Sequence, residues 1–301
     1  MRYRQLGSFG PTVSVLGLGA SHFGRVCDLE QTRAIVHAAL DAGITFIDTA
    51  EAYAGSEELL GQVLQERRQD VIVSSKFGHP WTHPQGKRGS REVVRASIEG
   101  TLRRLRTDYL DLYLMHFDDP DAPLEETLEA LHELVQRGCV RFVGASNFPA
   151  WKIVDAHWIA RTQQLTPFAC VQYPYNLLDR QIERDVVPVC THYGLGLVAA
   201  VPLASGLLSG RYRRGEPVSP GTRLATRPPL SETVFDQLDK LRGFARERDV
   251  SLLELAICGL AALPSVGPVI TGATTPEQIR ANARAADWAP SAADLAALNA
   301  L

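Results

Sequence analysis

The chain has 301 residues, of which 45% are hydrophobic and 22% charged, and its formal net charge is −3. This balance is that of a soluble globular protein, and it argues against a nucleic-acid or membrane partner, which would require a clustered basic face. The five cysteines are scattered without metal-ligand spacings. They therefore predict reduced thiols and no metal site, and with the lack of an apolar leader they favour a cytoplasmic protein.

Short apolar runs alternate with amphipathic segments along nearly the whole chain. The runs show little polar alternation, which is typical of parallel strands covered on both faces. The segments between them carry helix signals: Asp28 and Gln31 have the spacing of a capping box, and Gly43 marks the end of the same helix. The predicted strands are residues 15–18, 44–47, 71–74, 110–115, 140–144, 170–172, 197–201 and 269–271.

Eight such strands with helices between them predict an α/β fold, a closed (β/α)8 TIM barrel, in one domain over residues 1–301. An open, Rossmann-like sheet is the alternative. Two stretches depart from the alternation. Residues 2–14 contain Gly7 and Gly10 and predict a short β-hairpin before the first barrel strand. Residues 203–230 are rich in glycine and proline and too long for a plain connection, which is typical of a functional loop.

Polar side chains stand at the ends of three successive strands, where a barrel of this type carries its chemistry. Asp48 ends the second strand and Tyr53 follows it, Lys76 ends the third, and His116 ends the fourth. Each alone is weak evidence, but together they form a coherent acid–base site. An ammonium favours the phenolate form of a nearby tyrosine, a carboxylate would hold that ammonium in place, and an imidazole can donate a hydrogen bond to a carbonyl oxygen.

Four segments of the chain resemble a known family. Residues 46–53, Lys76 and residues 114–116 are similar to the catalytic segments of the aldo-keto reductases, and residues 138–148 resemble the most recognisable internal stretch of that family. The segments occur in the family's order, and the resemblance covers almost the whole chain.

The resemblance implies a nicotinamide-dependent oxidoreductase that reduces aldehydes or ketones to alcohols, or runs the reverse reaction. In that family Tyr53 would be the general acid, Lys76 and Asp48 would tune it, and His116 would position the substrate. The implied cofactor is NADP(H), with NAD(H) as the second possibility.

The resemblance also implies where the cofactor binds. Ser146, Asn147 and Gln172 match residues that hold the carboxamide, and residues 203–210 match the loop around the pyrophosphate, where small residues and backbone amides are suitable. The complete set of cofactor-binding residues implied in this way is Gly19, Asp48, Ser146, Asn147, Gln172, Leu203, Ser205, Gly206, Leu208, Thr274, Gln278, Arg280 and Asn282.

Two departures from the family pattern affect the cofactor. Ala200 stands where many relatives carry a tyrosine that stacks on the nicotinamide. Gly272 and Gln278 stand where many carry the Lys and Arg that contact an adenosine 2′-phosphate. Arg280 is then the nearest basic residue, and the sequence predicts modest discrimination between the two cofactors.

The substrate pocket is predicted from aromatic residues near the strand ends: His22, Phe23, Trp81 and Phe117. The expected partner is a small carbonyl or alcohol, bound by a monomer or small homo-oligomer.

Two other functions stay open. One is a cofactor-binding regulatory barrel with little turnover.

The second open function is that of a metal-dependent hydrolase, which would use His116 with Asp118, Asp119 and Asp121. We interpret these acidic residues instead as a solvated loop and a helix N-terminus.

Overall fold

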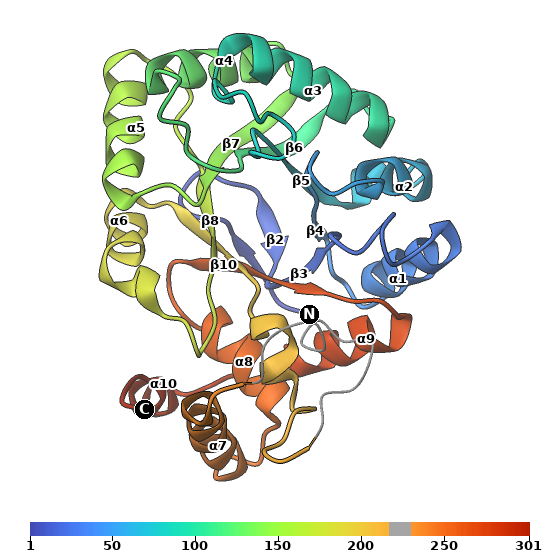
Figure 1. Ribbon diagram of the computed structural model, residues 1–301, viewed down its shortest axis with the longest axis vertical. Helices are drawn as coiled ribbons and strands as arrows, with labels where there is room; N and C mark the ends of the chain where they lie inside the picture. The colour runs from blue at the N-terminus through green and yellow to red at the C-terminus, as the bar shows by residue number, and fades with distance from the viewer. Residues whose placement is uncertain (217–229) are drawn as a thin grey trace.

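Eight parallel strands close into a barrel in this computed structural model, which describes residues 1–216 and 230–301 (Figure 1). The predicted (β/α)8 barrel is confirmed, and the open sheet is excluded because β10 pairs with both β9 and β3. Of the predicted loop 203–230, residues 217–229 lie outside the described residues. The barrel strands are β3 (Leu16–Gly19), β4 (Phe46–Asp48), β5 (Ile72–Phe77), β6 (Leu110–Met115), β7 (Val140–Ser146), β8 (Cys170–Pro174), β9 (Gly196–Ala200) and β10 (Val266–Gly272).

Helices surround this barrel, and two further helices pack at its periphery beside α8 (Figure 1). The capping box at Asp28 is confirmed: its side chain accepts a hydrogen bond from the Gln31 backbone, and the Gln31 side chain accepts one from the Asp28 backbone. The surrounding helices are α1 (Leu29–Asp41), α2 (Ser56–Val63), α3 (Arg91–Leu105), α4 (Leu124–Gln136), α5 (Ala150–Thr162), α6 (Val186–Tyr193), α8 (Leu252–Ala261) and α9 (Pro276–Ala285). The peripheral helices are α7 (Glu232–Arg246) and α10 (Ala292–Asn299).

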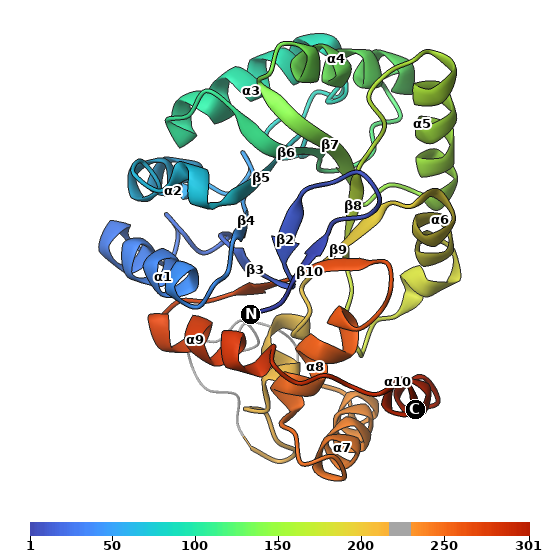
Figure 2. The same ribbon diagram turned by 180° about the vertical axis from the view of Figure 1, so that it is seen from behind.

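The predicted hairpin is also confirmed, as β1 (Tyr3–Gln5) paired antiparallel with β2 (Thr12–Ser14). It covers the end of the barrel where the strands begin (Figure 2). Leu6 is fully buried against the first residues of β9 and β10. Gly196 and Gly267 leave room for its side chain, since a Cβ at either position would lie 2.4 Å from Leu6 Cδ1. The hairpin and Leu6 therefore close this end of the barrel.

The strands end later than the sequence predicted in two places that matter for the site. Strand β5 continues to Phe77 and β7 to Ser146, so Lys76 and Ser146 lie within strands. Their polar side chains interrupted the apolar runs from which the strands were predicted. The parallel register then sets Gly19 beside Asp48 and Ser146 beside Gln172.

Within the described part of the chain, no helix has both the length and the apolar composition needed to cross a membrane.

Candidate active site

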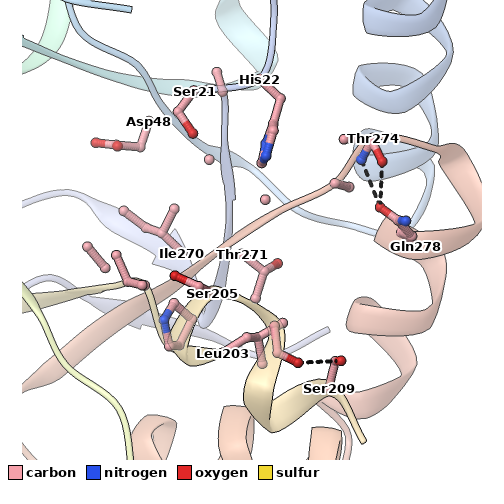
Figure 3. A pocket seen from close by; sticks show the side chains of 18 of the residues that line it. Ser21, His22, Asp48, Leu203, Ser205, Ser209, Ile270, Thr271, Thr274 and Gln278 are labelled. Carbon is pink, nitrogen blue, oxygen red and sulfur yellow. Dashed lines mark hydrogen bonds between the residues drawn. The ribbon is translucent and has the colours of Figure 1, made fainter. Parts of the chain in front are cut away.

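A cavity of about 400 Å³ opens at the carboxyl ends of the strands (Figure 3). Its wall comes from the ends of β3, β4, β8, β9 and β10 and from the segment that follows β9. Figure 3 shows Thr271 below His22 and beside Ser205. The polar residues on the wall are Ser21, His22, Asp48, Tyr53, Gln172, Ser205, Ser209, Arg211, Tyr212, Thr271, Thr274 and Gln278.

A buried ion pair lies at the base of this cavity. Lys76 is 0% exposed, and its Nζ donates to Asp48 Oδ2 at 2.6 Å and to the Thr49 carbonyl at 2.8 Å. Gln172 Nε2 donates to the other Asp48 oxygen at 3.0 Å. Burial by itself lowers the pKa of Lys76, but the Asp48 carboxylate and the Tyr53 hydroxyl oppose it, and the net effect raises that pKa. Lys76 is therefore a charged ammonium.

Tyr53 brings its phenol ring to this pair from the loop between β4 and α2. The ring centroid lies 5.1 Å from Lys76 Nζ. The His116 ring meets the phenol edge to face, with the centroids 5.9 Å apart. Asp48, Tyr53, Lys76 and His116 are thus brought together, as the strand-end argument predicted.

His116 is held as a neutral imidazole. It is 7% exposed, and burial, followed by nearby Lys76 and His79, lowers its pKa to about 2. Its main chain is fixed on both sides, because its N–H donates to the Phe77 carbonyl at 2.8 Å and its carbonyl accepts from Asn147 Nδ2 at 3.0 Å. Nδ1 is buried with no hydrogen-bond partner among the described residues. The ring can offer one N–H without carrying a charge.

The residues predicted to bind the cofactor fall into two groups. Those on the cavity wall are Gly19, Asp48, Gln172, Leu203, Ser205, Gly206, Thr274 and Gln278. The other five are Ser146, Asn147, Leu208, Arg280 and Asn282. Ser146 and Asn147 do not line the cavity, and Asn147 Nδ2 donates to the His116 carbonyl and to Ser146 Oγ. Leu208 and Asn282 are buried.

Arg280, predicted as the nearest basic partner of a 2′-phosphate, lies elsewhere. It lines a separate cavity of about 330 Å³ formed by residues of α1 and α9, together with Asp41 and Arg284. It also lies 3.6 Å from Glu277. Its position on α9 turns it toward α1, because residues 278 and 280 of a helix face different directions.

Gln278 fixes the loop that begins α9. Gln278 Oε1 accepts hydrogen bonds from the Thr274 backbone at 2.8 Å and from the Thr274 hydroxyl at 3.1 Å (Figure 3). The Thr275 side chain caps the helix by accepting from the Gln278 backbone. Gln278 thus shapes this side of the cavity.

The cavity also contains polar residues that the sequence analysis missed. Arg211 is the one Arg or Lys that lines it among the described residues. Thr271 Oγ1 is buried and, within the same part of the chain, has no hydrogen-bond partner. A basic residue directly after a glycine-rich loop is a signal that could have found Arg211. Thr271 sits in a strand among apolar neighbours and gives no such signal.

The segment before Arg211 has an unusual backbone. Ala204, Ser205 and Gly206 have φ values of 46°, 59° and 102°, in the left-handed region. Non-glycine residues adopt this conformation at a cost, and such strain concentrates at ligand sites. Consecutive amides in conformations of this kind can form an anion-binding concavity.

The four residues predicted for the substrate pocket are placed differently from one another. His22 lines the cavity, and Phe117 stacks on His116 with centroids 5.1 Å apart. Phe23 is 0% exposed and belongs to the core, so it does not line the cavity. Trp81 is 82% exposed, and its ring contacts His79.

The acidic residues considered for a metal site have structural partners. Asp119 is buried and accepts hydrogen bonds from the Gly89 and Asp121 backbones. Asp118 forms an ion pair with Lys152. Among the described residues, no group of three or more His, Cys, Asp or Glu side chains is arranged to hold a metal ion.

Comparison with known sequences places the chain in a family. It matches the Aldo/keto reductase family over residues 15–301. It is 37% identical to a probable voltage-gated potassium channel subunit beta of Oryza sativa subsp. japonica, over 96% of this chain and 92% of that protein. It is 33% identical to L-glyceraldehyde 3-phosphate reductase of Escherichia coli (strain K12), over 95% and 87%. It is 31% identical to the aldo-keto reductase YhdN of Bacillus subtilis (strain 168), over 100% and 93%.

The fold and the site define a class of α/β-barrel proteins with a cluster of titratable side chains at the carboxyl end of the barrel. Within that class, the chain belongs to the aldo/keto reductase family. The family and the relatives named as reductases and oxidoreductases support a carbonyl-reducing oxidoreductase.

Proposed function

We propose that residues 1–301 form one barrel domain that reduces aldehydes or ketones to alcohols, or runs the reverse reaction, with NADP(H) or NAD(H). The observation that carries this proposal is the buried Lys76–Asp48 pair beside the Tyr53 ring. A charged lysine in a fully buried position is costly unless it is paired, and perturbed groups in a cavity mark functional sites.

The cavity fits a nicotinamide cofactor. Its volume of about 400 Å³ falls in the range of ligand pockets. The left-handed backbone at Ser205 and Gly206 suits a pyrophosphate, and Arg211 supplies a positive charge on the same side. The unpartnered Thr271 hydroxyl offers a further polar contact. When bound, the reduced cofactor would supply the hydride.

Residues of this chain would carry out the proton transfer. Tyr53 would give its hydroxyl proton to the carbonyl oxygen as the alcohol forms. The Lys76 ammonium would stabilise the phenolate that remains, and Asp48 would keep Lys76 charged and in place. His116 would donate a neutral N–H to the same oxygen and so fix its orientation.

The test of this proposal is whether the protein catalyses carbonyl reduction. Purified protein is mixed with NADPH or NADH and a panel of aldehydes, ketones and sugars, and the loss of reduced nicotinamide is followed by absorbance. We expect saturable reduction of several carbonyls with both cofactors. Tight cofactor binding with no turnover of any compound would contradict the proposal.

That contrary outcome would instead favour a second candidate, a cofactor-binding regulatory barrel. The observation in its favour is that relatives from rice, Arabidopsis thaliana and Schizosaccharomyces pombe are named as probable or putative voltage-gated potassium channel subunits beta. The same cavity would then sense the cofactor instead of turning it over. Relatives named as reductases make catalysis the first candidate.

A further inference from the structure

Tyr53 lies in the middle of a short loop whose two ends are joined by side chains. The loop runs from Thr49, directly after β4, to Ser56, the first residue of α2. Thr49 Oγ1 and Ser56 Oγ lie 2.8 Å apart, and both residues are 0% exposed. Neither hydroxyl takes part in the proposed proton transfer, so this buried pair has no function in that mechanism.

The direction of these hydrogen bonds follows from the second partner of Ser56. Ser56 Oγ also lies 3.0 Å from the Ala20 carbonyl, which can only accept. The single hydroxyl hydrogen of Ser56 is therefore donated to Ala20, and the Thr49 hydroxyl must donate to Ser56 Oγ. The two hydroxyls form one directed chain, from Thr49 at the start of the loop to Ser56 at its end and on to Ala20 after β3.

Thr49 also contacts the lysine of the site through its main chain. Its carbonyl accepts from Lys76 Nζ at 2.8 Å, and its N–H donates to the Ser74 carbonyl at 2.8 Å. One residue thus binds the ammonium with its carbonyl and the far end of the Tyr53 loop with its hydroxyl. The hydroxyl bond therefore fixes the loop relative to Lys76.

The rest of the loop is shaped by backbone contacts. The Tyr53 N–H donates to the Ala50 carbonyl at 3.0 Å, and the Ser56 N–H donates to the Tyr53 carbonyl at 2.9 Å. Gly55 then lies backbone to backbone against Gly24, since a Cβ on Gly55 would lie 3.0 Å from Gly24 Cα. To these contacts the hydroxyl pair adds a side-chain bond that joins the two ends of the loop.

The start of α2 has a separate anchor. Glu57 is 1% exposed and accepts hydrogen bonds from Ser75 Oγ on β5 and from Arg104 Nε, the latter at 2.7 Å. Replacing the Thr49 hydroxyl by a methyl group leaves this anchor in place. Such a change should therefore loosen the Tyr53 loop without unfolding the helix.

We propose that Thr49 is a positioning residue, whose hydroxyl closes the Tyr53 loop and holds the phenol beside the Lys76 ammonium. The Tyr53 ring centroid lies 5.1 Å from Lys76 Nζ, and proton transfer depends steeply on the placement of the donor. Loss of the hydroxyl bond lowers the fraction of molecules in which the Tyr53 hydroxyl is correctly placed. This assignment rests on the proposed function of Tyr53.

The experiment compares Thr49→Val, which has the same shape without the donor, with Thr49→Ser, which keeps the hydroxyl. Each is made in the wild type and in Tyr53→Phe. The measured quantities are kcat and KM for the aldehyde that the wild type reduces fastest, and the Kd of NADPH. Thr127→Val is the matched control, because Thr127 on α4 is 2% exposed and donates its hydroxyl to the Gly89 carbonyl at 2.7 Å.

We expect Thr49→Val to lower kcat about three- to tenfold, the effect of one neutral hydrogen bond, with the Kd of NADPH unchanged. Ser56→Ala removes the acceptor of the same bond and should lower kcat at least as much. Thr49→Ser should recover most of the loss, and Thr127→Val should keep the wild-type kcat. In Tyr53→Phe there is no hydroxyl to position, so Thr49→Val should cause no further loss.

Two results would overturn the assignment and leave the proposed function intact. One is an unchanged kcat in Thr49→Val and Ser56→Ala. The other is an equal loss of kcat from Thr49→Val in the wild type and in Tyr53→Phe, because Thr49 would then act on the fold and not through the phenol. Absence of carbonyl reduction by the wild type would overturn the proposed function and this assignment together.

Discussion

At the scale of single residues, Lys76 keeps a positive charge without contact with water. Asp48 and the Thr49 carbonyl replace the lost solvent, and Gln172 occupies the remaining side of the carboxylate. Removing one partner of such a pair leaves a buried charge uncompensated, which typically costs about 3–5 kcal/mol. The pair thus has a structural consequence in the fold and a catalytic one in the proposed function, and an experiment has to separate the two.

Lys76→Met separates them through pH dependence. Without the ammonium the phenolate of Tyr53 is harder to form, so the pH profile of alcohol oxidation should shift upward. The control is Lys152→Met, which breaks another Lys–Asp pair, the one with Asp118 outside the cavity. It should lose some stability and keep the original profile. A Lys76→Met enzyme that is less stable but has the wild-type profile would reduce Lys76 to a structural partner of Asp48.

His116 predicts a measurable link between pH and stability. In the unfolded chain this imidazole is protonated below about pH 6.5, whereas in the folded chain it stays neutral down to its pKa of about 2. The free energy of unfolding therefore falls as the pH drops below about 6.5, because the unfolded chain binds a proton that the folded chain does not. The loss from this group is up to about 1.4 kcal/mol per pH unit. Urea unfolding of His116→Gln between pH 6.5 and 4.5 should show a shallower fall than the wild type. If the wild type and His116→Gln lost stability equally over this pH range, His116 would be protonated in the folded protein as readily as in the unfolded chain.

At the scale of elements, the segment after β9 and the start of α9 both contribute to the wall of the cavity. The sequence drew attention to both, because glycines cluster in residues 203–210 and polar residues precede α9. It could not tell which basic residue faces inward. That depends on how residues 210–212 leave the short helix at Ala204–Ser209 and on the rotation of α9, which places Arg280 over α1.

Arg211→Ala tests this placement. A charged hydrogen bond contributes about 1.5–3 kcal/mol, so the variant should bind NADPH about ten- to a hundredfold more weakly in a fluorescence titration. Equal losses for NADPH and NADH would assign Arg211 to the pyrophosphate, and a loss for NADPH alone would assign it to the 2′-phosphate. Arg280→Ala is the control and should bind both cofactors like the wild type. If only Arg280→Ala weakens NADPH, the assignment of Arg211 is wrong.

The secondary structure was predictable where local signals decide it. The Asp28 capping box needs only neighbouring residues, and it forms as predicted. Helix α10 was not predicted, although Ser291 and Asp294 have the same capping-box spacing and do form one. The late ends of β5 and β7 could not be read from hydrophobicity, because polar residues there are buried by the site itself.

At the scale of the whole molecule, closure of the barrel brings distant residues together. Gln172 donates to Asp48, from which it is 124 residues away in the chain, because β4 and β8 both end at the same rim. The clustering of Asp48, Tyr53, Lys76 and His116 was predictable for this reason, since three of them lie at or next to strand ends of a barrel and Tyr53 lies in the loop that follows one. Arg211 was not predicted and Phe23 was misplaced, because loop packing decides whether such side chains face the cavity or the core.

The proposed function makes Tyr53 the proton donor, and Tyr53→Phe tests this most directly. The ring stays in place between Lys76 and His116 while the hydroxyl is removed, so the folded structure and cofactor affinity should persist. Tyr193→Phe removes a phenol from helix α6 and serves as the control. We predict that kcat for carbonyl reduction falls about 10²-fold or more in Tyr53→Phe and stays unchanged in Tyr193→Phe. A Tyr53→Phe enzyme with near wild-type kcat would contradict the account.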